Sequence, residues 1–445
     1  MDTTAAATTG AVPAESAATR RRGRLRPQEG DELAGVMDAE GRVDESRLRS
    51  YILKNGGVSP AERPWVWRFL FGIFPCSATT LQQPLLAEEL AVRYGAMKRK
   101  WQRLLPGTMR IRLNGSDDEL TAAVRFFEQR REREKERERQ EAVSPETRER
   151  LSFLELQAQV LLERVSLDLD QLTEAIRIID KDVPRTERDL DYFQGEGSAN
   201  LLVLREILIT FAAFHPEVSY AQGMSDLCSR FLEVLDSEAE AFWCFCSHME
   251  RAARDFSSEG LRRKIEMEAG LLKELDPELH SHLLTDATDT LAFCHRWLLL
   301  GFQREFDHSD ALRLFEVLSC DHLELLTPAL DRALCHQRLT TDHSTEEAGP
   351  PPLEPRPFNP DLTFELFVCA AILMQHREAL LRCRGEVQLI QFTSSLQGRL
   401  DLDTVLLSAT QHFLNYCSNL LRRGWGYPQA PPCNPPLLQL RGLFS

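Results

Sequence analysis

Two short polar stretches carry side chains that could act on another molecule. The first reads KDVPRT and follows an apolar helical run, with Asp182 three residues before Arg185. The second reads SYAQGMSDL, with Gln222 directly before a glycine. An arginine side chain carries a permanent positive charge, and a glutamine amide can accept a hydrogen bond from water while it donates one to a carbonyl.

Local backbone chemistry is expected to position both side chains. A residue before proline is biased away from the helical region, so Val183 should leave the helix and send Arg185 onto a turn. Asp182 could hold that guanidinium by a charge-assisted hydrogen bond. Gly223 permits a sharp turn directly after Gln222. Taken alone, each stretch is explained at least as well by a structural role.

The sequence contains no motif for a nucleotide or metal site of its own. Walker A, GxGxxG, HExxH and GxSxG patterns are absent. The eleven cysteines lack zinc-finger spacing, and the eleven histidines do not cluster at ligand spacing. We therefore expect buried free thiols in a reducing compartment and histidines with structural roles.

Composition narrows the class of protein. With 445 residues, of which 43% are apolar and 27% charged, the chain can bury a large core. A net charge of −15 argues against general nucleic-acid binding, which needs a basic surface. No apolar run approaches the roughly 18 residues that would span a bilayer, and the N-terminus lacks the apolar segment of a signal peptide. The cytosol is the expected compartment.

Helical periodicity dominates the chain, and we find no alternating run with hairpin turns, so an all-α fold is predicted. The start of the helix in SPAERPWVWRFLFG is open between a capping box at Ser59 and a start at Pro64. Later helices are predicted at residues 81–104, 238–254, 261–282, 289–305, 362–383 and 402–422. Another has Leu201, Leu204, Leu208 and Phe211 on one face.

Three motifs in order resemble the TBC domain, the family of GTPase-activating proteins for Rab GTPases. RxxxWxxLxG is matched by Arg63, Trp67, Leu70 and Gly72. IxxDxxR is matched by Ile179, Asp182 and Arg185, and YxQ by Tyr220 and Gln222. The sequences KDVPRT and HPEVSYAQGMSDL are similar to those of a branch of this family whose members act at endosomes and autophagic membranes.

The resemblance implies a role for each motif residue. Arg185 would be an arginine finger and Gln222 a glutamine finger, both inserted into the partner's active site. Asp182 would orient Arg185, and Tyr220 would fix the Gln222 loop. Supporting roles fall to Gly223 and Met224, which shape and anchor the turn, and to Ile179. The RxxxWxxLxG residues would tie the first helices to the core.

The resemblance also implies a TBC-type domain of two helical lobes at residues 34–425. It would follow a disordered segment at 1–33, precede a Pro-rich tail at 426–445, and contain a charged insertion at about 110–150 and a Pro-rich loop at about 340–360. The basic cluster at 20–26 could touch anionic membranes, although a solubilising role explains it as well.

The implied partner is a Rab-family GTPase in its GTP-bound state, which carries GTP and Mg²⁺, so the chain needs no cofactor of its own. Its expected location is cytoplasmic, with peripheral association at endosomal or autophagic membranes. The alternative is a non-catalytic TBC module that binds a Rab as an adaptor or scaffold.

Overall fold

The computed structural model describes residues 32–105, 144–194, 198–287, 290–320 and 362–422, together with Arg125, Phe127 and Gln129. The disordered segment predicted at 1–33 lies outside these residues except for its last two. The basic cluster at 20–26, the loop at 340–360, the tail and most of the charged insertion also lie outside them. The described residues do not test the domain bounds of 34–425, which remain a prediction.

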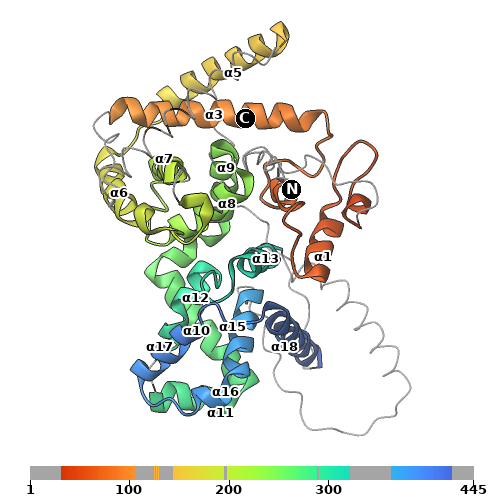
Figure 1. The fold of residues 1–445 in the computed structure, drawn as a ribbon, viewed down its shortest axis with the longest axis vertical. Helices are drawn as coiled ribbons and strands as arrows, with labels where there is room; N and C mark the ends of the chain where they lie inside the picture. Colours follow the sequence, from red (N-terminus) through yellow and green to blue (C-terminus); the bar gives the residue numbers. More distant parts are fainter. Residues whose placement is uncertain are drawn as a thin grey trace, which may run out of the picture.

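The described chain is all-α and forms two helical lobes, one above the other in Figure 1. The N-terminal lobe contains α2 (Arg63–Leu70), α3 (Gln82–Leu104), α5 (Pro145–Glu163), α6 (Leu169–Asp182), α7 (Ser198–Phe214), α8 (Met224–Leu235) and α9 (Glu238–Ala252). The C-terminal lobe contains α10 (Ser258–Leu275), α11 (Pro277–Ser281), α12 (His295–Leu300), α15 (Phe364–Gln375), α16 (Arg377–Leu380), α17 (Glu386–Ser395) and α18 (Leu402–Arg422). Helices α1 (Glu45–Asn55) and α13 (His308–Leu318) lie where the lobes meet.

Helix α7 is the central helix of the N-terminal lobe. It packs against α3, α6, α8 and α9, and its side chains from Ala199 to Phe214 are all buried. The sequence predicted only one buried face, lined by leucines and a phenylalanine. The helix is instead buried on every side because it is surrounded by neighbours, and it ends before Pro216 as expected.

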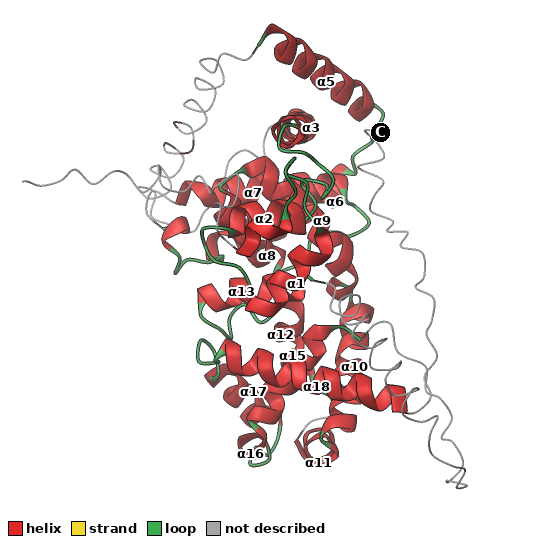
Figure 2. Ribbon diagram, turned by 90° about the vertical axis from the view of Figure 1, so that its right-hand side faces the viewer, coloured by secondary structure: helices red, strands yellow, loops and turns green. Residues whose placement is uncertain are grey.

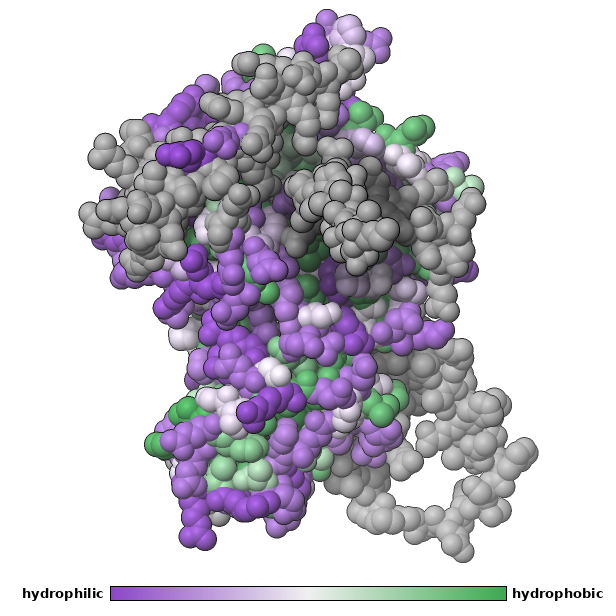
Figure 3. Space-filling model, viewed as in Figure 1, coloured by the Kyte–Doolittle hydropathy of each residue, from purple (hydrophilic) through white to green (hydrophobic). Residues whose placement is uncertain are grey.

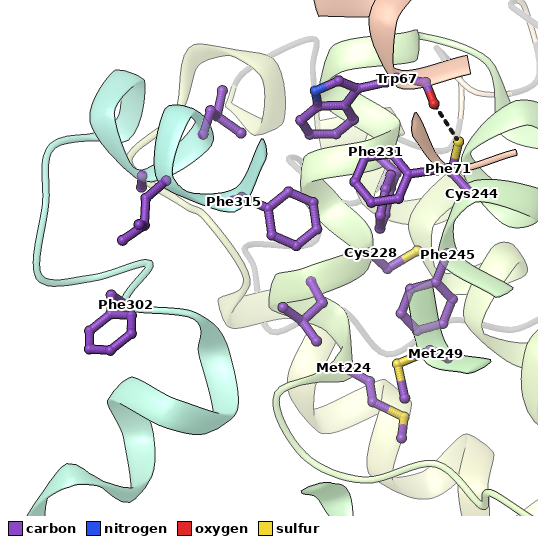
Figure 4. Close-up of a cluster of buried hydrophobic side chains, with 14 of the residues drawn as sticks. Trp67, Phe71, Met224, Cys228, Phe231, Cys244, Phe245, Met249, Phe302 and Phe315 are labelled. Carbon is purple, nitrogen blue, oxygen red and sulfur yellow. Dashed lines mark hydrogen bonds between the residues drawn. The ribbon is translucent and has the colours of Figure 1, made fainter. Parts of the chain in front are cut away.

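One hydrophobic cluster runs from Leu33 to Cys417 and therefore through both lobes. Its aromatic centre joins α2, α8 and α13 (Figure 4). The ring of Phe231 lies 4.8 Å from Phe71 and 5.4 Å from Trp67, both edge-on, and Phe315 stacks on Phe71 at 5.5 Å. These are the preferred geometries of aromatic pairs, so the cluster fixes the first helices against the centre of the molecule.

The helix at the first motif begins at Arg63, with Pro64 in its first turn. A proline there costs no hydrogen bond, because the first N–H groups of a helix have no partner within it. Ser59 donates from its hydroxyl to the Glu62 carboxylate over 2.6 Å, in the turn that precedes the helix. The start at Pro64 is thus closer to the structure than a cap at Ser59.

Three helices of the C-terminal lobe differ from their predictions. The helix expected at 261–282 is divided, because Asp276 accepts from the N–H of Leu279 and caps a new helix that begins at Pro277. The helix expected at 289–305 is replaced by a 3₁₀ turn, η9 (Ala292–Cys294), and by α12, which ends at Leu300 and is capped by Gly301. The one expected at 362–383 is divided into α15 and α16, and α17 was not predicted.

Helix α5 lies against α3 and extends beyond the rest of the N-terminal lobe (Figure 2). Polar side chains cover most of the described surface on the face drawn in Figure 3. Of the nine cysteines among the described residues, all are free thiols, and all except the half-buried Cys76 are buried. No helix in the described part of the chain is long and apolar enough to span a membrane.

Candidate functional site

The first motif forms a buried network between α2 and α13. Glu316 is the acceptor at its centre. Its Oε1 accepts from Arg63 over 2.5 Å and from the Trp67 indole over 2.9 Å, while Oε2 accepts from the backbone of Val58 over 2.7 Å. Burial raises the pKa of Glu316 even though Arg63 lies beside it. This network joins the lobes and presents no polar group at the surface.

The remaining residues of this motif end α2. Leu70 is the last residue of the helix and is buried. Gly72 adopts a positive φ of 70° in the turn that follows, a conformation that favours glycine.

The stretch KDVPRT begins on the last turn of α6, where Ile179 is fully buried. The α-helix ends at Asp182 and continues as a 3₁₀ turn, η4 (Val183–Arg185). The prediction that Val183 leaves the helical region is wrong: its φ and ψ are −54° and −44°. Its side chain is buried in the core, and this burial outweighs the local preference before proline. The chain turns away one residue after Arg185, at Thr186, where ψ is 125°.

Asp182 connects the two polar stretches. Its Oδ1 accepts a 2.5 Å hydrogen bond from Nη2 of Arg185, which is the ion pair expected from the sequence. Its Oδ2 accepts a 3.1 Å hydrogen bond from the hydroxyl of Tyr220. The Asp182 carboxylate is buried, whereas the Arg185 side chain is 58% exposed. The guanidinium is therefore anchored at one end and open to solvent at the other.

The second stretch is a tight loop between α7 and α8. Tyr220 is buried, and Gln222 is exposed with no hydrogen-bond partner for its amide among the described residues. Gly223 adopts φ of +99° at the N-terminus of α8, as its place after Gln222 predicts. Met224 is fully buried, and its sulfur accepts from the N–H of Ala221 over 3.4 Å. This loop thus places one amide side chain at the surface.

A further link between the two loops was missed from the sequence. The Thr186 hydroxyl donates to the backbone carbonyl of Asp182 over 3.0 Å and lies 2.9 Å from the hydroxyl of Ser225. Both Thr186 and Ser225 are buried. Thr186 directly follows Arg185, and Ser225 lies three residues after Gln222. Both hydroxyl residues therefore stand inside the two polar stretches, where they could have been predicted to link the loops.

The protonation states around the loops favour these contacts. Burial, and then the charge of Asp182, raises the pKa of Tyr220 well above its ordinary value, so its hydroxyl stays a donor. Burial raises the pKa of Asp226, and Arg304, Arg230 and Arg185 oppose that effect. The Arg185 guanidinium thus acts on the Asp226 carboxyl as well as on Asp182, to which it is hydrogen-bonded.

A separate cavity of about 250 Å³ lies between α8, α9 and the C-terminal lobe. Its polar lining comes from His248, Arg251, Ser319, Thr363 and the ion-paired group Asp255, Lys264 and Glu365. The two exposed side chains of the polar loops do not line it. In the described part of the chain, no group of histidine, cysteine, aspartate and glutamate residues is arranged to hold a metal ion.

The loops can thus present a cation and an amide together to a molecule that docks on the surface. The predicted residues divide into two sets. Asp182, Arg185 and Tyr220 are joined by hydrogen bonds, with Gln222 exposed two residues after Tyr220, whereas Arg63 and Trp67 belong to the buried network.

Comparison with known families agrees with the sequence motifs. Residues 132–331 match the family model of the Rab-GTPase-TBC domain, and both polar loops lie inside this match. Human TBC1 domain family member 17 is 30% identical over 290 residues, which cover 65% of this chain and 36% of that protein. TBC1 domain family member 25 of Mus musculus is 34% identical over 279 residues, or 62% of this chain and 29% of that protein.

A fungal relative matches more of the chain. The GTPase-activating protein GYP7 of Yarrowia lipolytica is 26% identical over 394 residues, which cover 86% of this chain and 43% of that protein. The chain spans about a third of the length of the first two relatives and less than half of the fungal one.

The fold is similar to a solved structure, the crystal structure of the Ypt/Rab-GAP domain of Gyp1p. The TM-score is 0.53 at 17% identity, and the match covers 86% of this chain and 95% of that one. At this identity the likeness shows the fold. The family match and the ordered motifs show that the chain contains a domain of the TBC (RabGAP) family.

Proposed function

We propose that this chain is a GTPase-activating protein for a Rab-family small GTPase, and that Arg185 and Gln222 enter the partner's active site. One observation carries the proposal. The buried Asp182 carboxylate accepts hydrogen bonds from the exposed Arg185 and from Tyr220, which lies two residues before Gln222. One buried group therefore holds the two loops that present Arg185 and Gln222. A relative named as a GTPase-activating protein supports the same activity.

The proposed mechanism follows from the chemistry of the two side chains. In phosphoryl transfer, negative charge spreads over the transferred oxygens, and a guanidinium supplied in trans can accelerate the reaction by about 10³–10⁵, or roughly 4–7 kcal/mol. Arg185 would supply that charge. The Gln222 amide would accept from the attacking water and orient it. GTP and Mg²⁺ would come with the partner.

Asp182 and Tyr220 act indirectly in this mechanism. An exposed arginine has many rotamers, and ordering it at the moment of docking costs conformational entropy. The bond to Asp182 orders the guanidinium beforehand, so that less of the binding energy is consumed in positioning it. Tyr220 holds Asp182 from its other oxygen.

We also propose action at endosomal or autophagic membranes, with regulation of vesicle trafficking. The support is the likeness of KDVPRT and SYAQGMSDL to the branch that acts there. Imaging of the tagged full chain against markers of both compartments tests this part separately, and a distribution that excludes both would contradict it.

The experiment for the activity is single-turnover GTP hydrolysis by a panel of purified, GTP-loaded Rabs. Wild type should accelerate at least one Rab, and Arg185→Ala and Gln222→Ala should each abolish the acceleration. Arg177→Ala is the matched control, because Arg177 is an exposed arginine of α6 that, like Arg185, is paired with an acid three residues before it. Gln397→Ala removes a different exposed amide. A Rab that binds without acceleration would instead establish the adaptor alternative.

A further inference from the structure

The end of α12 and the turn that follows it, together residues 300–304 of the C-terminal lobe, contact both polar loops of the N-terminal lobe. Gln303 of this turn is buried and bridges two groups. Its amide nitrogen donates to the carboxylate of Glu187, two residues after Arg185. Its amide oxygen accepts from Nε of Arg230 over 3.0 Å and from Nη2 over 2.5 Å. One side chain thus joins the Arg185 loop to helix α8.

The same turn also reaches the Gln222 loop. Arg304 donates from Nη2 to Asp226 over 3.3 Å, and Asp226 is four residues after Gln222. A Cβ atom at Gly223 would lie only 2.9 Å from a methyl group of Leu300, so the backbone after Gln222 packs directly on the turn. Arg230 ties the turn to α8 a second time by donating to the Leu300 carbonyl over 2.7 Å.

Backbone strain is concentrated in three segments: the Arg185 loop, the Gln222 loop and the turn after α12. Among the described residues, four that are not glycine have positive φ angles, and three of them lie here. They are Glu187 at 46°, Ser219 at 56° and Phe302 at 59°. The Phe302 side chain is fully buried and belongs to the hydrophobic cluster, at some distance from its aromatic centre (Figure 4). Strained conformations persist only where the surroundings over-determine them, and they occur preferentially at functional sites.

We propose that Gln303 is a positioning residue for the GTPase-activating reaction, which makes the C-terminal lobe part of the machinery that presents Arg185 and Gln222. This inference rests on the proposed function. Gln303 touches neither reacting group. It acts through Glu187 on the first loop and through Arg230 on the helix that begins at the second. The amide suits this place because one group must donate to a carboxylate and accept from a guanidinium at once.

The test compares Gln303→Met with Gln83→Met in the full chain. Both glutamines are buried and hydrogen-bonded, but Gln83 bonds the backbone of Gly41 and Ala78, far along the chain from either polar loop. With the Rab that wild type accelerates, Gln303→Met should lower kcat roughly tenfold and leave KM within about twofold. The Gln83→Met control should leave both constants at the wild-type values.

A second variant covers the case in which Gln303→Met does not fold. Glu187→Ala removes the acceptor from the first loop at a half-buried position, and it leaves the buried Arg230 with the carboxylate of Asp226. It should reproduce the fall in kcat on its own. Where Gln303→Met does fold, the double variant should be no slower than Gln303→Met alone, because both changes break one link.

A measurement without Rab separates this inference from the proposed function. Hydrogen exchange of the backbone amides at residues 185–188 and 219–224 should be faster in Gln303→Met by about tenfold and unchanged in Gln83→Met. Unchanged exchange and unchanged kcat would overturn the inference. If wild type accelerates no Rab, the proposed function fails, and faster exchange at both loops would still establish the positioning link itself.

Discussion

Tyr220 donates a 3.1 Å hydrogen bond to Asp182, a residue 38 positions earlier in the chain. The bond crosses from the loop that carries Gln222 to the helix end that carries Arg185. Its acceptor is a buried carboxylate whose other oxygen holds Arg185. The two exposed side chains of the candidate site therefore share one internal anchor, and a change at the anchor should affect both.

Replacement of Asp182 by asparagine tests this anchor. The variant keeps the shape of the side chain but removes the charge that holds Arg185, so the guanidinium should become disordered. We expect kcat for Rab GTP hydrolysis to fall roughly 10- to 100-fold, with little change in KM. The matched control is Glu174→Gln, which breaks the exposed pair with Arg177 on the same helix and should leave kcat unchanged. Equal rates for the two variants would show that Asp182 does not position Arg185.

Replacement of Gly223 by alanine tests the second loop. Gly223 has φ of +99°, and an added Cβ would meet Leu300 at 2.9 Å, so the backbone must shift. We expect a loss of stability of about 1–2 kcal/mol and a lower kcat. Gly270→Ala is the control, because this glycine lies inside α10 with open space around its Cα. It should stabilise the protein by about 0.5–1 kcal/mol and leave kcat unchanged. Urea unfolding and single-turnover assays measure the two effects, and a Gly223→Ala protein as stable and active as wild type would refute the strain argument.

The buried network at Glu316 should matter for stability alone. Glu316→Gln leaves the Arg63 guanidinium buried without its counter-charge and turns an amide N–H toward one of three donors. We expect the free energy of unfolding to fall by about 3–5 kcal/mol. In contrast, Asp403→Asn breaks a pair whose acid is largely exposed and should cost less than about 1 kcal/mol.

Activity measured on the folded fraction completes this test. Since no residue of the network reaches the polar loops, the folded Glu316→Gln protein should keep the wild-type kcat. A selective loss of kcat would assign the first motif a part in the reaction.

Stability should fall in mild acid because His215 is buried as a neutral ring. Its Nδ1 lies 3.0 Å from the Phe211 carbonyl, which can only accept, so Nδ1 carries the proton. Burial lowers the pKa of His215 to about 4, whereas an unfolded histidine has a pKa of about 6.5. Between these values the unfolded chain binds a proton that the folded chain does not bind, and stability therefore decreases as pH falls.

The measurement is urea unfolding at pH 7.5 and pH 5. His215 should account for about 2 kcal/mol of the loss between them, and His215→Phe should remove that share. Exposed His295→Phe is the control and should leave the pH dependence as in wild type. An unchanged pH dependence in His215→Phe would show that this ring is not held neutral.

The sequence predicted the parts of the site that are local. Arg185 follows its anchor by three residues, and Gly223 follows Gln222 directly, so spacing and turn chemistry marked both stretches. Their roles came from the resemblance to the ordered TBC motifs. The prediction for Val183 failed because a local preference was outweighed by burial in the core. Gln303 and Glu316 were missed for a different reason. Each pairs with a residue more than 70 positions away, and nothing nearby in the sequence marks such a partner.

The hydrophobic cluster that passes through both lobes has a consequence for how the molecule can be divided. Trp67 and Phe71 precede the 132–331 match to the family model, and Phe364 and Phe413 follow it, yet all four belong to the same cluster. A fragment cut at the limits of the match would expose the apolar surfaces that these side chains cover. The two lobes should therefore unfold in a single cooperative transition, and the shortest autonomous unit must include the helices on both sides of the match.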